Sequence, residues 1–293
     1  MKKFTALLVV CAIVLLIPGC HPGDRQADIV ATTKPVYDFT AFLCQDTGIT
    51  VGQLVTENLS CLHDYTLQVR QMRMIENAKA VILSGAGLEE FLHDALHNAG
   101  HVIDTSKGIS LICGGHEHEH HESEGHHHAE DPHIWLSVSN ARQMAENIYN
   151  GLCDLYPEKH AQFSKNLSAL QVKFDDLDTY GQKNFSNLES NKLITFHDGF
   201  AYFAQYWNLE ILHSLEEESG SEASAAELKE LVQLVKKHNI PAIFTEENGS
   251  TSAADIVARE TGISTYHLSM GMSQKDYFET MYHNIDTIKE ALG

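Results

Sequence analysis

The sequence predicts an α/β protein of two lobes, each built on a mostly parallel sheet flanked by helices. Two observations carry this prediction. Short apolar stretches alternate with segments of helical period along most of the chain, and one long amphipathic segment lies near its middle. The 293 residues leave room for two lobes, and the 43% hydrophobic content excludes the disordered and collagen-like classes.

The first twenty residues have the layout of a secretory signal. Lys2 and Lys3 precede an apolar run from 4 to 17, which is shorter than the roughly 20 residues that span a bilayer. The small residue before Cys20 is typical of bacterial lipoprotein signals, in which the cysteine becomes the lipid-modified first residue. We therefore expect residues 1–19 to be removed and the chain to be held outside the cytoplasm, at the cell surface or in the periplasm, through Cys20. A plain membrane anchor is the alternative.

The first half of the remaining chain alternates between strand and helix patterns. Strand-like stretches are expected at 28–32, 50–55, 80–84, 101–105 and 109–112, and helical patterns at 36–43, 67–77 and 88–98. A polar tract then interrupts the alternation, and 139–155 resumes it as a helix with Ser139 as its candidate N-cap. Strands that alternate with helices indicate parallel βαβ units.

A long helix is predicted from 158 to 190, because apolar side chains recur there at spacings of three and four. The members of this stripe are Phe163, Leu167, Leu170, Phe174, Leu177 and Tyr180. The alternation then returns, with strands expected at 193–196, 210–213, 242–245 and 264–268, and helices at 200–206, 223–238, 252–261 and 275–292. The predicted domains are an N-terminal lobe (20–157), a linking helix (158–190) and a C-terminal lobe (191–293).

The net charge narrows the range of possible partners. With 40 acidic and 20 basic side chains the net charge is −20, which argues against a nucleic-acid partner. We expect a monomer.

In an exported chain, two disulfides are expected to form among Cys44, Cys61, Cys113 and Cys153, although their pairing is open. The alternative, thiolate metal ligands, lacks the close spacing of a zinc knuckle.

Histidine is unusually abundant, at 19 residues, and many of them gather in one polar tract at 114–130. Seven lie there: His116, His118, His120, His121, His126, His127 and His128. Such a tract is a metal-binding composition, and a solvated low-complexity loop is the alternative. Ordering a loop on binding costs entropy, so this segment is expected to collect metal at modest affinity.

Three further histidines are dispersed: His63, His133 and His197. Each follows a strand-like stretch or a loop entry, where α/β folds place ligands. Taken singly, each is more often an ordinary surface residue than a ligand. Together they supply three imidazoles, the minimum for a rigid zinc site.

In this region the chain resembles a known family. The segment Asp131-Pro132-His133-Ile134-Trp135-Leu136-Ser137, directly after a His-rich insertion, is similar to a motif of the metal-binding solute-binding proteins of ABC transporters, specifically the zinc-uptake members. The matching segments elsewhere are 34–38, 63–65, 75–78, 197–203, 242–246 and 260–262. The resemblance implies two lobes joined by one rigid helix, with Zn²⁺ held in the cleft by His63, His133 and His197. It also implies a permease and its ATPase as partners.

The fourth ligand is where the chain departs from the family. Relatives often supply a carboxylate near 268–270, whereas this chain has Ser269. The candidates for the fourth position are water, His267, Glu246 and Glu247.

Three aspartates adjoin the predicted ligands, namely Asp64, Asp131 and Asp198, and could orient the imidazoles. For Asp198, turn and capping chemistry is an equal alternative.

Two other functions remain open from the sequence. A zinc hydrolase could use the open fourth position for an activated water, with Glu246 or Glu247 as its base. Against this reading, the chain has no HExxH helix, nucleophile elbow or nucleotide loop. A manganese-binding or adhesin-type surface lipoprotein would share the same fold. Manganese prefers carboxylate oxygens, so three imidazoles favour zinc.

Overall fold

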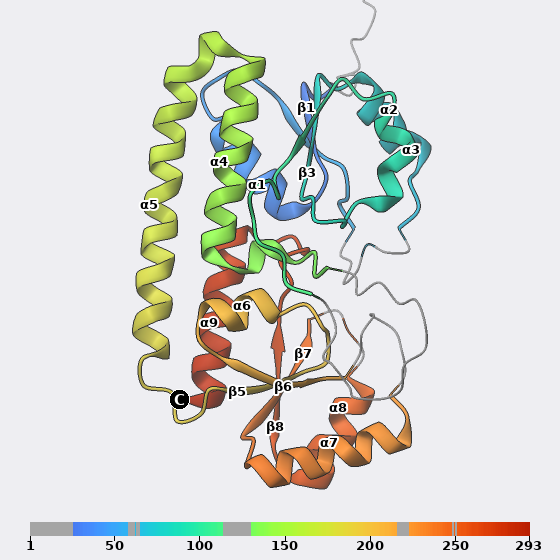
Figure 1. Ribbon diagram of the computed structural model, residues 1–293, viewed down its shortest axis with the longest axis vertical. Coiled ribbons are helices and arrows are strands. Elements are labelled where there is room, and N and C mark those ends of the chain that lie inside the picture. The colour runs from blue at the N-terminus through green and yellow to red at the C-terminus, as the bar shows by residue number, and fades with distance from the viewer. Residues whose placement is uncertain are drawn as a thin grey trace, which may run out of the picture.

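The computed structural model describes residues 26–57, 62, 65–113, 130–215, 223–247, 249 and 251–293. The predicted signal with Cys20 lies outside the described residues, as do Cys61, His63, Asp64 and the seven histidines of the 114–130 tract. Two parallel sheets, one in each half of the chain, are flanked by helices, which confirms the predicted fold class (Figure 1). No helix in the described ranges is both long and apolar enough to cross a lipid bilayer.

The first sheet has the strand order β2-β1-β3-β4, with all neighbours parallel. Its strands are β1 (Ile29–Ala31), β2 (Val51–Gln53), β3 (Ala80–Leu83) and β4 (His101–Asp104), and its helices are α1 (Lys34–Leu43), α2 (Val69–Asn77) and α3 (His93–Leu96). Ile29 and Ala31 join the large core that contains α1, whereas Val30 joins a separate cluster with residues of α2 and α3. Burial on both faces explains why β1 reads as an unbroken apolar run.

Two predicted elements differ from the structure. The helix expected at 88–98 is a 3₁₀ turn, η1 (Glu90–Leu92), followed by the single turn of α3. The buried Glu89 carboxylate accepts hydrogen bonds from the backbone N–H groups of Ser84 (2.7 Å) and Gly85 (3.0 Å), so the chain folds back there instead of extending a helix. The strand expected at 109–112 is wrong, because Ile112 gives its N–H to the Tyr202 hydroxyl (2.9 Å) and not to a sheet neighbour.

The second sheet repeats the same topology, in the order β6-β5-β7-β8 and again with parallel neighbours. Its strands are β5 (Lys192–Thr195), β6 (Glu210–Ser214), β7 (Ala242–Glu246) and β8 (Ser264–Leu268), and its helices are α6 (Ala201–Tyr206), α7 (Ala225–His238), α8 (Ser252–Thr261) and α9 (Tyr277–Leu292). Side chains alternate between two cores. Phe244 faces the large core, whereas Ile243 packs with α7 and α8.

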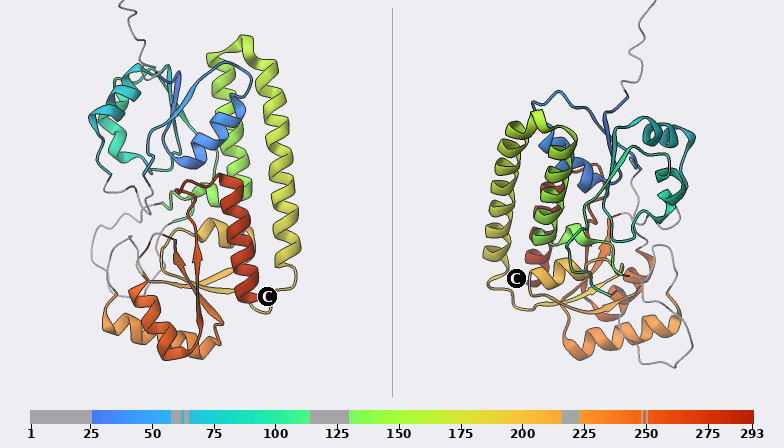
Figure 2. Two further views of the ribbon diagram at one scale, coloured as in Figure 1. Left: turned by 180° about the vertical axis from the view of Figure 1, so that it is seen from behind. Right: turned by 45° about the horizontal axis from the view of Figure 1, so that its top comes forward.

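Two long helices join the halves. The helix α4 (Val138–Leu155) begins at Ser137, whose Oγ accepts from the Asn140 N–H, so Ser137 and not Ser139 is the N-cap. After the 3₁₀ turn η3 (Pro157–Lys159) comes α5 (His160–Phe185), 26 residues or about 39 Å long. It runs beside α4 and α9 along one flank of both sheets (Figures 1 and 2). All but two of its predicted stripe residues are buried in the large core, which is therefore continuous across both halves.

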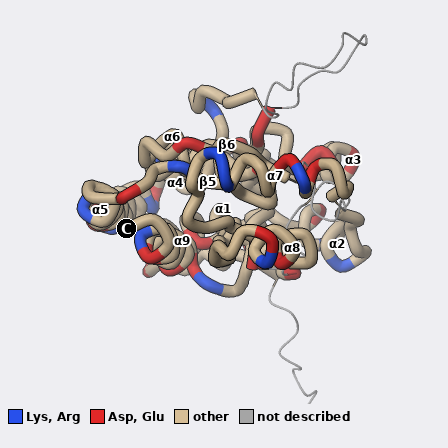
Figure 3. The backbone as a smooth tube through the Cα atoms, turned by 90° about the horizontal axis from the view of Figure 1, so that it is seen from below, with Lys and Arg blue, Asp and Glu red and all other residues tan. Residues whose placement is uncertain are grey.

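Among the described residues, the backbone positions of Lys and Arg form no continuous stripe in the view from below (Figure 3). Lys and Arg positions are interspersed with Asp and Glu positions along the helices there (Figure 3). The net charge of −20 disfavours binding to phosphate backbones.

Candidate metal centre

His133 is held in one orientation by Asp131, two residues before it. Asp131 Oδ1 accepts from the His133 backbone N–H (2.9 Å) and lies 2.8 Å from its ring Nδ1. Both side chains are buried, so little water competes for these bonds. Because the carboxylate accepts a hydrogen bond from Nδ1–H, the lone pair of the neutral His133 ring is on Nε2. This arrangement is the one found where a carboxylate prepares a histidine to bind metal.

His197 meets His133 from the other half of the chain. It follows the carboxyl end of β5, and its ring centroid lies 5.3 Å from that of His133 with the ring planes at 85°. Both residues are about 5% exposed. The structure thus brings together two of the three predicted imidazoles at the carboxyl end of a parallel strand, where ligands are expected. The third, His63, lies outside the described residues.

Gly199 makes this close approach of the two rings possible. A Cβ at this position would lie 3.0 Å from His133 Nδ1, 2.9 Å from His197 Cδ2 and 2.4 Å from Met270 Cε. Real Cβ atoms almost never come within 3.0 Å of another heavy atom, so only glycine fits beside the pair without displacement. The position was not singled out from the sequence, although it belongs to the His197-Asp198-Gly199 segment that resembles the family.

Hydrogen bonds from the second half of the chain fix the segment that carries His133. The Tyr202 hydroxyl, on α6, donates to the Asp131 carbonyl (3.1 Å). Burial raises the pKa of Tyr202, which keeps this hydroxyl protonated. Trp135 Nε1 donates to the Met270 carbonyl (2.8 Å), and the Tyr277 hydroxyl donates to the Trp135 carbonyl (3.0 Å). None of these partners is adjacent in sequence, so spacing along the chain could not reveal them.

The ends of the His-rich tract meet next to the Asp131–His133 pair. Cys113 and Glu130 form an antiparallel bridge, and the Asp131 N–H donates to the Ile112 carbonyl (2.9 Å). The described chain therefore enters and leaves this insertion at one point, directly beside the candidate centre.

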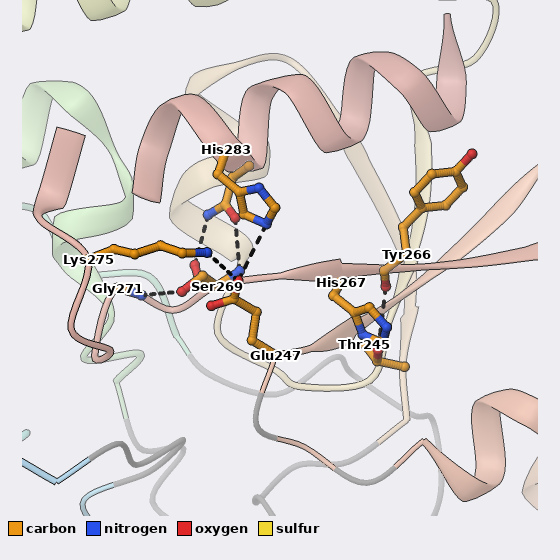
Figure 4. A network of polar contacts seen from close by, with 9 residues as sticks. Thr245, Glu247, Tyr266, His267, Ser269, Gly271, Lys275 and His283 are labelled. Carbon is orange, nitrogen blue, oxygen red and sulfur yellow. Dashed lines mark hydrogen bonds and ion pairs between the residues drawn. The ribbon is translucent and has the colours of Figure 1, made fainter. Parts of the chain in front are cut away.

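The predicted candidates for a fourth ligand are separated by the sheet geometry. Thr195, the last residue of β5, pairs with Phe244 of β7; β7 continues to Glu246, whereas His197 lies two residues past the end of β5. Glu246 is buried at the end of β7. His267 of β8 lies on the sheet face opposite Glu246: it is exposed, and its Nδ1 is 2.7 Å from the Thr245 hydroxyl (Figure 4).

Glu247 is engaged by basic groups of the C-terminal segment. Its Oε1 accepts from Lys275 Nζ (2.6 Å) and lies 3.6 Å from His283 Nε2 (Figure 4). Burial alone would raise the pKa of Glu247, but the Lys275 ammonium outweighs it, so the pKa is lowered. Ser269 Oγ accepts from the Gly271 N–H (3.3 Å), and Asn284 bonds the Ser269 backbone N–H and carbonyl, each at 2.8 Å.

Asp198 does not bond to either imidazole in the described contacts. Its Oδ1 instead accepts from the Ser214 hydroxyl (3.3 Å) at the end of β6. Of the predicted orienting aspartates that the structure describes, Asp131 contacts a candidate ligand, His133, and Asp198 does not. Asp64 lies outside the described residues.

The expectation of two disulfides is contradicted. Cys44, Cys113 and Cys153 are free thiols. Two disulfides among four cysteines would need at least one bond within this trio. Cys44 directly follows α1, Cys113 lies in an isolated bridge and Cys153 lies within α4; burial raises the pKa of the Cys44 thiol to about 12, which leaves it unreactive.

Two parallel sheets that share one core, with a buried imidazole pair between them, place the protein among the two-lobed solute-binding proteins. Comparison with known sequences then specifies the family. The sequence model described as "Zinc-uptake complex component A periplasmic" (ZnuA) matches residues 29–291, and the chain belongs to this family. The family is described by an uptake role and not by a reaction.

Individual relatives agree with this assignment. The zinc-binding lipoprotein AdcA of Streptococcus pneumoniae is 30% identical over 99% of this chain, which spans 61% of that protein's length. The high-affinity zinc uptake system protein ZnuA of Bacillus subtilis is 29% identical, with 99% of this chain and 98% of that protein covered. The crystal structure of the Zn(II)-bound ZnuA-like domain of pneumococcal AdcA is 28% identical, with a TM-score of 0.76 over 91% of this chain and 99% of that domain.

Proposed function

We propose that this protein captures Zn²⁺ outside the cytoplasm and delivers it to the permease of an ABC transporter, which its ATPase drives. The observation that carries the proposal is the buried pair of imidazoles, His133 and His197, contributed by the two halves of the chain, with His133 oriented by Asp131. Membership of a zinc-uptake family supports the same function.

The proposed ligands are His63, His133 and His197. Neutral imidazole suits zinc better than manganese, which prefers carboxylate and water oxygens. Copper would bind such a set more tightly than zinc does, so selectivity has to come from a tetrahedral geometry and from the metal that is available.

For the fourth position we propose Glu246 or water. Glu246 is buried at the end of β7, the strand beside the one that His197 follows, whereas Glu247 is held by Lys275 and the exposed His267 lies on the sheet face opposite Glu246. A carboxylate at the end of a central strand would complete a tetrahedral site without adding a loop.

The rest of the chain fits this role as proposed. Residues 1–19 would direct export and Cys20 would carry the lipid anchor, which leaves residues 20–157 and 191–293 as lobes on either side of the linking helix at 158–190. The 114–130 tract would collect metal at modest affinity and release it to the buried centre, beside which both ends of the tract lie.

The ligand set is tested by zinc titration of the mature chain against a competing chelator. Each of His63→Ala, His133→Ala and His197→Ala leaves at most two imidazoles, and we expect at least a tenfold loss of affinity, about 1.4 kcal/mol. Among Glu246→Ala, Glu247→Ala and His267→Ala, only a true ligand should show a comparable loss. If all three are silent, water holds the position. Retention of the tight site in His197→Ala would refute the ligand set.

Delivery is tested separately, with the permease and ATPase reconstituted in vesicles. We expect ATP hydrolysis and zinc uptake to require the zinc-loaded protein. A wild-type response from zinc-free protein or from His133→Ala would contradict delivery while leaving zinc capture intact.

A further inference from the structure

A second group of metal-binding side chains lies on the surface of the first half, apart from the candidate centre. It consists of His93, Asp94 and His97, within and just after the single turn of α3. Among the described residues, this is the one group of three or more such side chains whose ligand atoms come close enough to share an ion. The three are exposed, so water and dissolved metal can reach them.

The geometry of this group follows from local backbone structure. His93 begins α3, and His97 keeps right-handed helical angles (φ −58°, ψ −26°), so the two lie four residues apart on one helical face. Their ring centroids are 5.2 Å apart with the ring planes at 90°, and His93 Nδ1 is 3.3 Å from Asp94 Oδ1. One ligand atom from each residue lies within 4.8 Å of the others.

The inner side of the α3 turn packs against the protein interior, which holds these metal-binding side chains in place. Leu92 is fully buried, and Leu96, four residues later, packs into the same apolar cluster against β1 and β3. His93 follows Leu92 and His97 follows Leu96, so both histidine side chains point outward. An ion can therefore be bound there without first ordering a loop.

From this geometry we infer that His93, Asp94 and His97 form a second metal site, for a borderline divalent cation such as Zn²⁺. Two imidazole nitrogens and one carboxylate oxygen are ligands that zinc accepts, and water completes the coordination. Two histidines four residues apart on a helix are a recurrent zinc-binding arrangement. Because the site is exposed and has only three protein ligands, it binds more weakly than a closed four-ligand site. The inference does not depend on the function proposed for the buried centre.

The test uses the full mature chain with one equivalent of Zn²⁺ already bound, and Ni²⁺ as a paramagnetic probe followed by amide NMR. Ni²⁺ should broaden the signals of residues 90–98 at a concentration at least tenfold below that needed around His101. His101 is an exposed histidine of β4 and serves as the internal reference for a single imidazole. Added Zn²⁺ should reverse the broadening by displacing Ni²⁺.

Three variants decide the outcome. The double variant His93→Gln/His97→Gln should abolish the preferential broadening, and Asp94→Asn should weaken it severalfold. The control His101→Gln should leave it unchanged. Circular dichroism and thermal unfolding check that these exposed substitutions preserve the fold. Broadening near 90–98 that is no stronger than at His101, or that survives the double substitution, would overturn the site whether or not the buried centre binds zinc.

Discussion

Replacing Gly199 by alanine should damage the metal centre without adding or removing any ligand. The new Cβ would come too close to three atoms, which differ in how easily they can move away. Met270 Cε, at 2.4 Å, is the end of a flexible side chain and can rotate away. His133 Nδ1, at 3.0 Å, is fixed by its bond to Asp131, and His197 Cδ2, at 2.9 Å, belongs to a buried ring. The displacement of the two imidazoles therefore determines how much stability and zinc affinity the substitution costs.

The magnitude follows from overpacking. One added methyl in a well-packed interior costs about 1–3 kcal/mol. Zinc sites tolerate ligand distances only within about 0.2 Å, so displaced rings should weaken zinc binding at least tenfold, about 1.4 kcal/mol. The assay is a chelator-competition titration with Zn²⁺, paired with chemical denaturation of the metal-free protein.

Gly249→Ala provides the matched control, because a Cβ there would meet only ordinary contacts of 3.5 Å or more, to Glu246. We expect nearly wild-type stability and zinc affinity for this variant. The double variant Gly199→Ala/Met270→Ala should recover some stability but not the zinc affinity. Wild-type zinc affinity in Gly199→Ala, or full rescue of binding by Met270→Ala, would refute the steric argument.

Three further predictions concern orientation, the insertion and a buried carboxylate. Asp131→Asn should weaken zinc binding by about 10- to 100-fold in the chelator titration, since the amide holds the His133 ring poorly; an unchanged affinity would contradict the orienting role. Calorimetry of wild type should resolve one tight Zn²⁺ and weaker ones, and deletion of 114–130 should remove weaker events while it leaves the tight one and the weak one assigned to His93, Asp94 and His97. Burial raises the pKa of Glu89 to about 7, above its usual value, so its contribution to the stability of the metal-free protein is present in acid and lost as pH rises through about 7. Denaturation of Glu89→Gln should therefore show a stability deficit that is larger near pH 5.5 than near pH 8, and a deficit independent of pH would contradict this.

The alternation of strands and helices could be predicted because both sheets are covered on both faces. The central strands β1 and β3 are continuous apolar runs, and each crossover helix shows its own period. The two misjudged elements depend instead on distant partners. The turn after β3 is set by the buried Glu89 side chain, and the segment at 109–112 is bound by Tyr202, some ninety residues further on.

The candidate centre was predictable only where the chemistry is local. Asp131 and His133 are two residues apart, so their pairing can be inferred from one segment. The fourth-ligand candidates were not separable, because strand register and the partners of Glu247 and His267 are set by packing between elements. The disulfide expectation failed for a related reason. An exported protein can form disulfides, but each bond requires two cysteines close together, and Cys44, Cys113 and Cys153 are free thiols in the structure.

The continuous core also limits how metal can enter. Phe39 of α1, Phe174 of α5 and Tyr277 of α9 form an aromatic cluster with centroid distances of 4.8 to 6.0 Å, so it ties both halves together. Opening the halves as a hinge would expose these rings, at about 1.5–3 kcal/mol for each one uncovered. Movement of the short segments that carry the ligands avoids that cost, and we infer that metal enters in this way. Amide hydrogen exchange should then change on zinc binding at 130–137 and 197–203 while α5 and α9 stay equally protected, and zinc-dependent protection along α5 would point to hinge opening instead.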